Sequence, residues 1–445
     1  MNGTTVETGD ILAKNGVIHT VPSLLLPSGS LSLTAEKYLI ALNCYRFVDL
    51  LRSVNLSHYV QLPSGEPSFN SDVPAFTILA PRDDAFEFDE WTNLPPKGSA
   101  ALKGILEYHI VSGRWLNKDL EDGMLIGTEL RGEDRKGRRQ MLEVNVADHD
   151  GGKSKPSLLS RFGLGLGTQA SKGHGTAVVG FGGASIIGEP VQVGDSIIYV
   201  LASILSPPNS LINTALSNLQ LSTYVAAVYA ASLDKILSHS PAITYLVPSN
   251  QAFTNLGLIM SYLLLPNSRD ELRSLIRYHA IDEIAYLNDF PTSGSKRYPT
   301  LDGAEIYVER AHNGTTIHGP TIGGYPANGD YRDARIVDGN TLIATGVLHV
   351  IDQVELPPSL DITIAKLLRG AKANTFVDLI RSANMTWVLE GRGPPVIKPS
   401  PFSEGAEEVE AGENVEVMKR KQNKAKINLA YTGSSPLSSL SYRPS

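Results

Sequence analysis

One stretch of this sequence occurs twice and constrains the fold more than any other feature. Residues 76–86 (FTILAPRDDAF) and 243–253 (ITYLVPSNQAF) carry the same order of elements. Each begins with an apolar run typical of a strand, passes through a proline and a short polar turn able to cap a helix, and ends in Ala-Phe on a first helical turn. A strand that feeds a capped helix is a structural unit, so its second appearance predicts a repeated domain.

Two further pairs of segments extend the repeat. Residues 102–109 (LKGILEYH) correspond to 272–279 (LRSLIRYH) at nearly the same interval. Residues 47–53 (FVDLLRS) return almost unchanged at 376–382 (FVDLIRS), about two periods later. Self-similarity at a fixed period is the signature of an array of similar units, so we expect tandem domains.

A further motif reads NGVIHTVP at 15–22 and returns as TGVLHVID at 345–352. With these motifs in this order, residues 1–432 resemble the fasciclin-like domain family. The resemblance implies an α+β fold in which each domain is a β-sandwich or wedge with helices packed beside it.

On this resemblance the chain divides into five parts. They are a C-terminal remnant of a fasciclin-like domain (1–27), a complete domain (31–208) with a Gly-rich insertion (148–175), a second complete domain (209–357), a truncated N-terminal part of a further domain (360–432) with a charged insertion (403–426), and a disordered tail (433–445).

Within the second complete domain, Ser249 is predicted to cap the helix after the repeated strand. Residues 334–351 predict two strands separated by the turn residues Asp338, Gly339 and Asn340.

Two features of the first complete domain were weighed for chemistry. Tyr199 stands where the family has its closing histidine, and a catalytic or metal role would not survive that exchange, whereas a packing role would. The pattern Gly165-x-Gly167-x-x-Ala170 resembles a dinucleotide loop, but no clear strand and helix flank it. A mobile surface loop is the favoured interpretation.

Composition narrows the classes of partner. The 39 basic and 46 acidic residues give a formal charge of −7, so no overall field favours nucleic acid or an anionic membrane, and no nucleic-acid partner is expected. Cys44 is the only cysteine, which excludes an internal disulfide and a multi-cysteine metal site and predicts a small buried residue. No cofactor and no metal are predicted.

The candidate site residues are Tyr108, His109, Tyr278 and His279. No hydrolase elbow, zinc motif or phosphate loop occurs, and these two histidines are the ones that recur in register. A buried, hydrogen-bonded histidine that orders the domain is one interpretation. The resemblance supplies the other, because the Tyr-His region of animal members is implicated in receptor-mediated adhesion. An enzyme using His109 or His279 is a further hypothesis.

Glycosylation acceptor triplets begin at Asn55, Asn313 and Asn384, and they matter only if the protein enters the secretory pathway. Asn55 and Asn384 follow the repeated FVDL helix at equivalent positions. No Arg-Gly-Asp occurs, and residues 131–133 (RGE) are given no integrin role.

The family implies a non-enzymatic protein of cell adhesion, or of contact with a cell surface or matrix. Its partners would be other proteins or glycans, including further copies of this chain. The alternative is a vacuolar or endomembrane-associated protein acting in membrane traffic. The family implies an extracellular, cell-surface or vacuolar and endomembrane lumenal location. The sequence has no signal peptide and no apolar run near the ~20 residues that a membrane helix needs.

Overall fold

The structure is a computed structural model, and it describes residues 5–22, 34–61, 75–87, 94–147, 178–312, 314–319, 321–322, 325–326, 333–390 and 393. Chain contacts divide the protein into two units, Met1–Leu379 and Ile380–Ser445. The predicted insertions 148–175 and 403–426, the tail 433–445 and Asn313 lie outside the described residues.

Domain 1 denotes the elements from α1 to β10. Their bounds are α1 Ala35–Ala41, α2 Tyr45–Ser53, η1 Ser57–Tyr59, β3 Phe76–Pro81, η2 Asp83–Phe86, α3 Ala100–Tyr108, β4 Ile110–Ser112, η3 Asn117–Asp119, β5 Leu125–Arg131, η4 Glu133–Arg135, β6 Arg139–Ala147, β7 Val178–Phe181, β8 Ala184–Ser185, β9 Val191–Val193 and β10 Ser196–Leu201. The strands form an 8-stranded sheet in the order β8-β7-β6-β5-β4-β3-β10-β9.

Domain 2 denotes the elements from α5 to β19. Their bounds are α5 Leu211–Leu216, η5 Leu219–Leu221, α6 Ser222–Ala230, α7 Asp234–His239, β11 Ile243–Pro248, α8 Asn250–Asn255, α9 Leu258–Leu263, η6 Pro266–Ser268, α10 Arg269–Tyr278, β12 Ala280–Ile281, η7 Leu287–Asp289, β13 Lys296–Pro299, β14 Glu305–Ala311, β15 Gly314–His318, β16 Thr321–Ile322, β17 Tyr325–Pro326, β18 Ala334–Ile343 and β19 Gly346–Ile351. Its 7-stranded sheet has the order β12-β11-β19-β18-β15-β14-β13.

Short elements flank the two domains. A hairpin of β1 (Thr8–Ala13) and β2 (Gly16–Thr20) precedes domain 1, and α11 (Ile364–Gly370), α12 (Asn374–Ser382) and α13 (Thr386–Leu389) follow domain 2. None of the helices within the described ranges combines the length and the apolar character needed to cross a bilayer.

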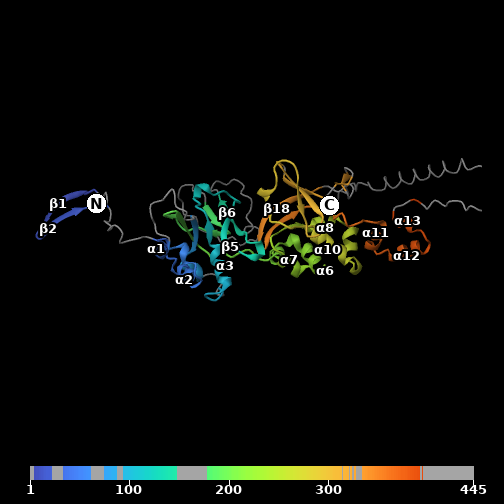
Figure 1. The fold of residues 1–445 in the computed structure, drawn as a ribbon, viewed down its shortest axis with the longest axis horizontal. Helices are drawn as coiled ribbons and strands as arrows, with labels where there is room; N and C mark the ends of the chain where they lie inside the picture. The colour runs from blue at the N-terminus through green and yellow to red at the C-terminus, as the bar shows by residue number, and fades with distance from the viewer. Residues whose placement is uncertain are drawn as a thin grey trace, which may run out of the picture. The chain divides into compact units, whose positions relative to one another are not determined.

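The strands β3, β10, β11 and β19 are buried along their whole length, so both faces of the sheet are covered there. In β11, Ile243, Tyr245 and Val247 pack against the helices of domain 2, whereas Leu246 points into a second cluster enclosed by the curved strands. Figure 1 shows the helices of each domain gathered on one side of its strands. The mixed sheet with helices beside it is the α+β architecture predicted from the sequence.

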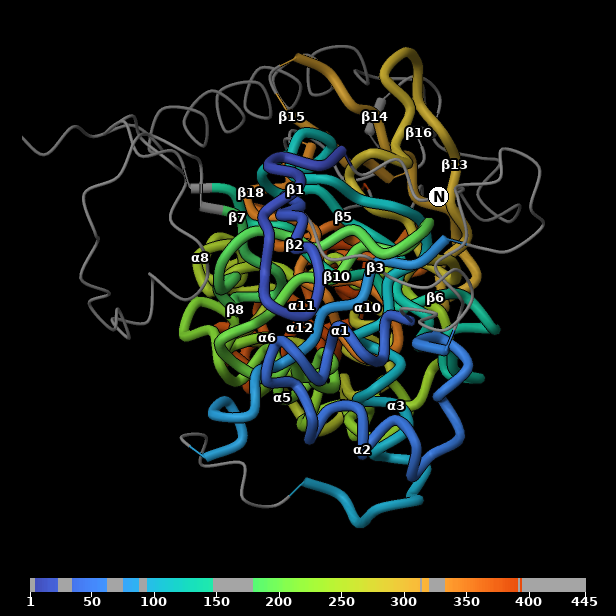
Figure 2. The backbone as a smooth tube through the Cα atoms, turned by 90° about the vertical axis from the view of Figure 1, so that its left-hand side faces the viewer, coloured from blue at the N-terminus to red at the C-terminus, as the bar shows by residue number. Residues whose placement is uncertain are grey.

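The repeated strand and the closing strand are immediate neighbours in both domains. β3 pairs in parallel with β10, with Leu79 opposite Tyr199, and β11 pairs in parallel with β19, with Leu246 opposite His349. Figure 2 shows β3 beside β10. Motifs that lie far apart in the sequence therefore pair as adjacent interior strands of each sheet.

The helix that follows the repeated strand begins differently in the two domains. In domain 2, Ser249 Oγ accepts a hydrogen bond from the Ala252 amide, which confirms the predicted cap of α8. In domain 1 the same position is Arg82, which gives no side-chain cap, and only the short 3-10 helix η2 follows.

The predicted turn at residues 338–340 is wrong. β18 runs through these residues to Ile343 and turns only before β19 begins at Gly346. The pairing register shifts at this point, and Asn340 has a φ of +61°. The turn-forming residues therefore make a bulge inside a strand. Turns and bulges use the same backbone conformations, so the local sequence does not distinguish one from the other.

Candidate functional site at the Tyr-His segments

His109 caps the C-terminus of α3 and is fully buried. Its Nδ1 lies 2.8 Å from the carbonyl oxygen of Ile105, and its Nε2 accepts a hydrogen bond of 3.0 Å from the Leu205 amide. A ring nitrogen that faces a carbonyl carries the proton, and the one that faces an amide does not. Burial lowers the pKa of His109 to about 4, so the ring is neutral near pH 7.

His279 repeats this arrangement at the end of α10. Its Nδ1 lies 2.8 Å from the Leu275 carbonyl oxygen, and its Nε2 accepts from the Glu355 amide at 3.1 Å. Burial lowers its pKa to about 4 as well. Both nitrogens of both histidines are thus engaged by backbone groups, so neither ring has a free nitrogen to act as a base.

The neighbouring tyrosines are also buried. The Tyr108 hydroxyl donates to the Met141 carbonyl at 3.4 Å, and the Tyr278 hydroxyl donates to the Glu305 carbonyl at 3.2 Å. Burial raises the pKa of both hydroxyls. Each Tyr-His pair therefore joins the end of one helix to one strand and to the segment that follows the closing strand.

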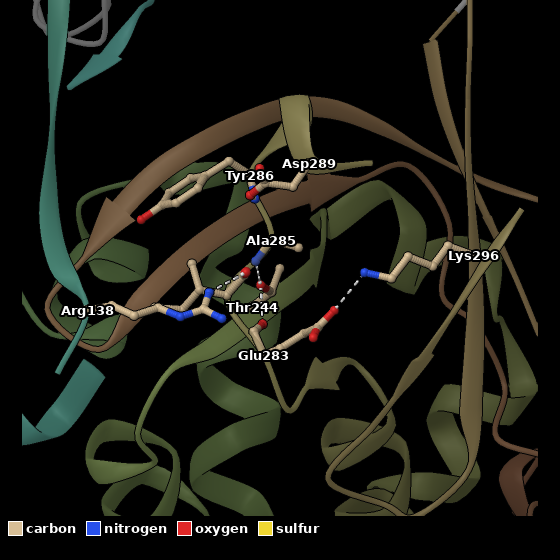
Figure 3. A network of polar contacts seen from close by, with 8 residues as sticks. Arg138, Thr244, Glu283, Ala285, Tyr286, Asp289 and Lys296 are labelled. Carbon is tan, nitrogen blue, oxygen red and sulfur yellow. Dashed lines mark hydrogen bonds and ion pairs between the residues drawn. The ribbon is translucent and has the colours of Figure 1, made fainter. Parts of the chain in front are cut away.

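A threonine of the repeated strand fixes the loop that follows each Tyr-His pair. The Thr244 hydroxyl donates to the Glu283 carbonyl at 2.7 Å and accepts from the Ala285 amide at 2.8 Å, as Figure 3 shows. Thr77 makes the equivalent pair of contacts with Gly113 and Trp115 in domain 1. No sequence motif marks these threonines as functional, although both stand at the second position of the repeated strand.

The closing strand reaches the same loop. His349 Nε2 lies 2.9 Å from the Ala285 carbonyl oxygen, and its Nδ1 accepts from the Asn340 amide at 3.1 Å. In domain 1 the Tyr199 hydroxyl lies 3.0 Å from the Trp115 carbonyl oxygen, which occupies the place of Ala285. Tyr199 is fully buried, so its predicted packing role is confirmed.

The two domains that share this network also match one protein family. The model of the fasciclin domain matches residues 42–207 and 219–357. The chain belongs to the fasciclin domain family. It is similar to the pig (Sus scrofa) transforming growth factor-beta-induced protein ig-h3, with 23% identity over 380 residues that cover 81% of this chain and 45% of that protein.

Other fasciclin relatives are equally distant. The FAS1 domain-containing protein YLR001C of Saccharomyces cerevisiae is 24% identical over 380 residues, which cover 82% of this chain and 38% of that protein. The chain thus spans less than half the length of these two relatives. A solved FAS1 domain pair from the insect cell adhesion molecule Fasciclin I aligns with 17% identity and a TM-score of 0.31, over 72% of this chain and 98% of that one.

The two fasciclin domains differ beside the Tyr-His pair. Where domain 1 has Leu205, domain 2 has Glu355, whose carboxylate accepts from the amides of Ala334 at 3.1 Å and of Gly319. Burial raises the pKa of Glu355 to about 7. Nothing in the sequence around this glutamate set it apart from ordinary surface charge.

Two of the predicted glycosylation acceptors are exposed at helix ends. Asn55 and Asn384 have φ values of +62° and +56°, directly after α2 and α12. In each case the next amide bonds back to a carbonyl of the last helical turn, Leu56 to Leu51 and Met385 to Ile380. Asparagine tolerates this left-handed conformation well, so both residues have a structural reason to be there besides any glycan.

Neither a metal site nor a reactive thiol occurs among the described residues. Across the part of the chain that the structure describes, no group of three or more histidine, cysteine, aspartate or glutamate residues is placed to hold a metal ion. Cys44 is buried, as predicted, and burial raises the pKa of its thiol to about 12.

Proposed function

We propose that this protein is a non-enzymatic adhesion protein that binds other proteins or glycans of a cell surface or matrix through its tandem fasciclin domains. Membership of the fasciclin family carries the proposal. The hydrogen bonding of both Tyr-His histidines supports it over the enzyme hypothesis, because proton transfer by either ring would require breaking a buried backbone contact.

In this proposal the four predicted site residues act from inside the domain. Tyr108, His109, Tyr278 and His279 hold the loops that follow them, and a partner contacts the loop surface. In domain 1 this loop, residues 112–119, exposes Arg114 and Lys118. These two cations are the side chains we expect a partner to meet first.

The proposal is tested by coating beads with the intact chain, with domain 1 or with domain 2, and by measuring aggregation and capture of matrix components. Linked weak contacts gain avidity, so either domain alone should bind at least about tenfold more weakly than the intact chain. Equal binding by one separate domain would contradict the role of the tandem arrangement.

A pair of variants separates surface contact from folding. Arg114→Ala with Lys118→Ala should weaken capture and leave the unfolding midpoint unchanged, whereas His109→Ala should lower both. The exposed lysine variant Lys235→Ala in domain 2 is the matched control. Unchanged capture by the Arg114/Lys118 variant would remove this loop from the binding surface.

We further propose that the protein carries N-linked glycans at Asn55 and Asn384 and works at the cell surface. Mass spectrometry before and after glycosidase treatment, together with localisation of the tagged native protein, tests both points. A vacuolar or endomembrane location would instead favour a role in membrane traffic.

A further inference from the structure

The loop between β5 and β6 of domain 1 is longer than its counterpart in domain 2. It spans residues 132–138 (GEDRKGR), whereas the corresponding turn between β13 and β14 spans only residues 300–304. The loop contains the short helix η4 and then turns sharply at Lys136, which has a φ of +52°. It carries two arginines and one lysine that all reach domain 2.

Arg135 is the most deeply placed of these cations, with 7% of the residue exposed. Its Nη1 donates to the Ala344 carbonyl of domain 2 at 2.7 Å. A Cβ on Gly132 would lie 3.2 Å from Nη2, so the glycine leaves room for the guanidinium to fold back over the loop. The side chain therefore lies between the two domains.

Arg138 and the loop backbone make two further contacts with domain 2. Arg138 Nη1 donates to the Ile284 carbonyl at 3.2 Å, and Figure 3 shows it approaching the loop that carries Ala285 and Tyr286. The Asp134 carbonyl accepts from the Ala242 amide at 2.9 Å. Ala242 and Ile284 are buried and belong to one small apolar cluster.

These contacts differ from ordinary surface ion pairs in their acceptors. The arginines donate to the backbone carbonyls of Ala344 and Ile284, which are neutral at every pH. Hydrogen bonds from a charged donor are stronger than neutral ones. The exposed pair between Lys136 and Asp282, at 3.1 Å, is screened by salt and contributes little. The interface should therefore withstand both acid and salt.

We propose that residues 132–138 are an interdomain clamp that holds domains 1 and 2 as one rigid body and covers the 282–286 surface of domain 2. The inference stands on these contacts and does not depend on the adhesion role. The covered position Ile284 corresponds to the exposed Arg114 in domain 1. The docking face is therefore particular to domain 2, and the 112–119 loop of domain 1 stays available to an external partner.

Distance measurement between spin labels in the full-length chain tests the clamp. Labels at Lys118→Cys in domain 1 and Lys235→Cys in domain 2 are both on exposed positions. The buried Cys44 thiol, with its raised pKa, should remain unlabelled. We expect one narrow distance distribution for the otherwise native chain, and at least a doubling of its width in the Arg135→Ala/Arg138→Ala variant.

Lys136→Ala is the matched control, because it removes a cation from the same loop without removing a carbonyl contact, and it should leave the width unchanged. Hydrogen exchange gives an independent reading, since the Ala242 amide should exchange at least about tenfold faster in the double variant. A broad distribution in the native chain would overturn the clamp without any variant, even if the double variant failed to fold. A folded double variant as narrow as the native chain would overturn it too.

Discussion

Domains 1 and 2 build the same internal network from different residues. In both, a threonine of the repeated strand and a residue of the closing strand hold the backbone of the loop after Tyr-His. The closing residue is Tyr199 in one domain and His349 in the other, yet both reach the equivalent carbonyl. The shared element is therefore the backbone position of the loop, which either a tyrosine or a histidine of the closing strand can hold.

The domains diverge in charge at one buried position. Leu205 fills it with apolar surface in domain 1, whereas Glu355 in domain 2 brings a carboxyl group that two amides hold. We therefore expect equivalent substitutions to destabilise the two domains equally where the network is shared, and unequally where it is not. Hydrogen exchange read separately in β3 and β11 gives the free energy of unfolding of each domain.

The largest effect should come from removing the shared histidines. His109→Ala and His279→Ala should each destabilise their own domain by about 4 kcal/mol, because each leaves a cavity and two unpaired backbone groups. His239→Ala, at an exposed helix end, is the control and should cost less than about 0.5 kcal/mol. A loss no larger than in this control would show that the network does not hold the domain.

Glu355 should make the free energy of unfolding depend on pH differently in the two domains. Its raised folded pKa means that the stability it contributes is present below the ordinary value of 4.5 and is lost as pH rises through about 7. Glu355→Gln keeps an acceptor and removes this dependence. Relative to the native chain, the variant should therefore gain about 3 kcal/mol in domain 2 between pH 4.5 and 7.5.

Unfolding across this pH range, read in β11, measures the Glu355 effect. Domain 1 should show no difference between the two proteins, and the exposed Glu121→Gln is the control. The buried histidines act in the opposite direction. Because their folded pKa is lowered, the domains lose stability as pH falls from 6.5 towards 4. A pH-independent difference between variant and native chain would contradict the burial of a titrating carboxyl.

The shared threonines should behave alike. Thr77→Val and Thr244→Val keep the shape of the side chain but leave one buried amide and one carbonyl without partners, so each should cost its domain about 2 kcal/mol. Thr316→Val, on the partly exposed strand β15, is the control. Clearly unequal losses at Thr77 and Thr244 would mean that the two loops are not held in the same way.

The smallest effect should come from Tyr199→Phe, which removes only the hydroxyl that lies 3.0 Å from the Trp115 carbonyl oxygen and 2.9 Å from Asn117 Oδ1. We expect a loss of about 1 kcal/mol in domain 1 and none in domain 2. Tyr45→Phe, at an exposed residue, is the control. If the Tyr199→Phe variant is as stable as the native chain, ring packing alone replaces the closing histidine.

Local patterns predicted those parts of the fold that local forces decide. The apolar run at residues 243–248 predicted β11, and Ser249 predicted the start of α8, because both depend on neighbours in the sequence. The Tyr-His pairs stand out in the sequence because they recur, and the same repeated motifs indicate the fasciclin-like family. Their burial was one of two open interpretations, since a pattern does not tell which side of a sheet a helix end will meet.

The interdomain contacts could not be predicted in the same way. Arg135 donates to a carbonyl 209 positions away, and residues 131–133 were considered only as an incomplete integrin motif. A backbone carbonyl carries no residue-type signal, so its partner cannot be identified from composition or spacing. Glu355 was missed for the same reason, because its acceptor role depends on two amides brought to it by the fold.

The parallel pairing of the repeated strand with the closing strand also sets the order of events during synthesis. β11 is an interior strand that lies between β12 and β19, and β19 is the last strand of the domain to leave the ribosome. Contacts between distant segments slow folding, and until β19 arrives one edge of β11 has no strand to pair with. Each domain therefore completes its sheet only after nearly all of it has been made, and domain 1 can do so before domain 2 is translated.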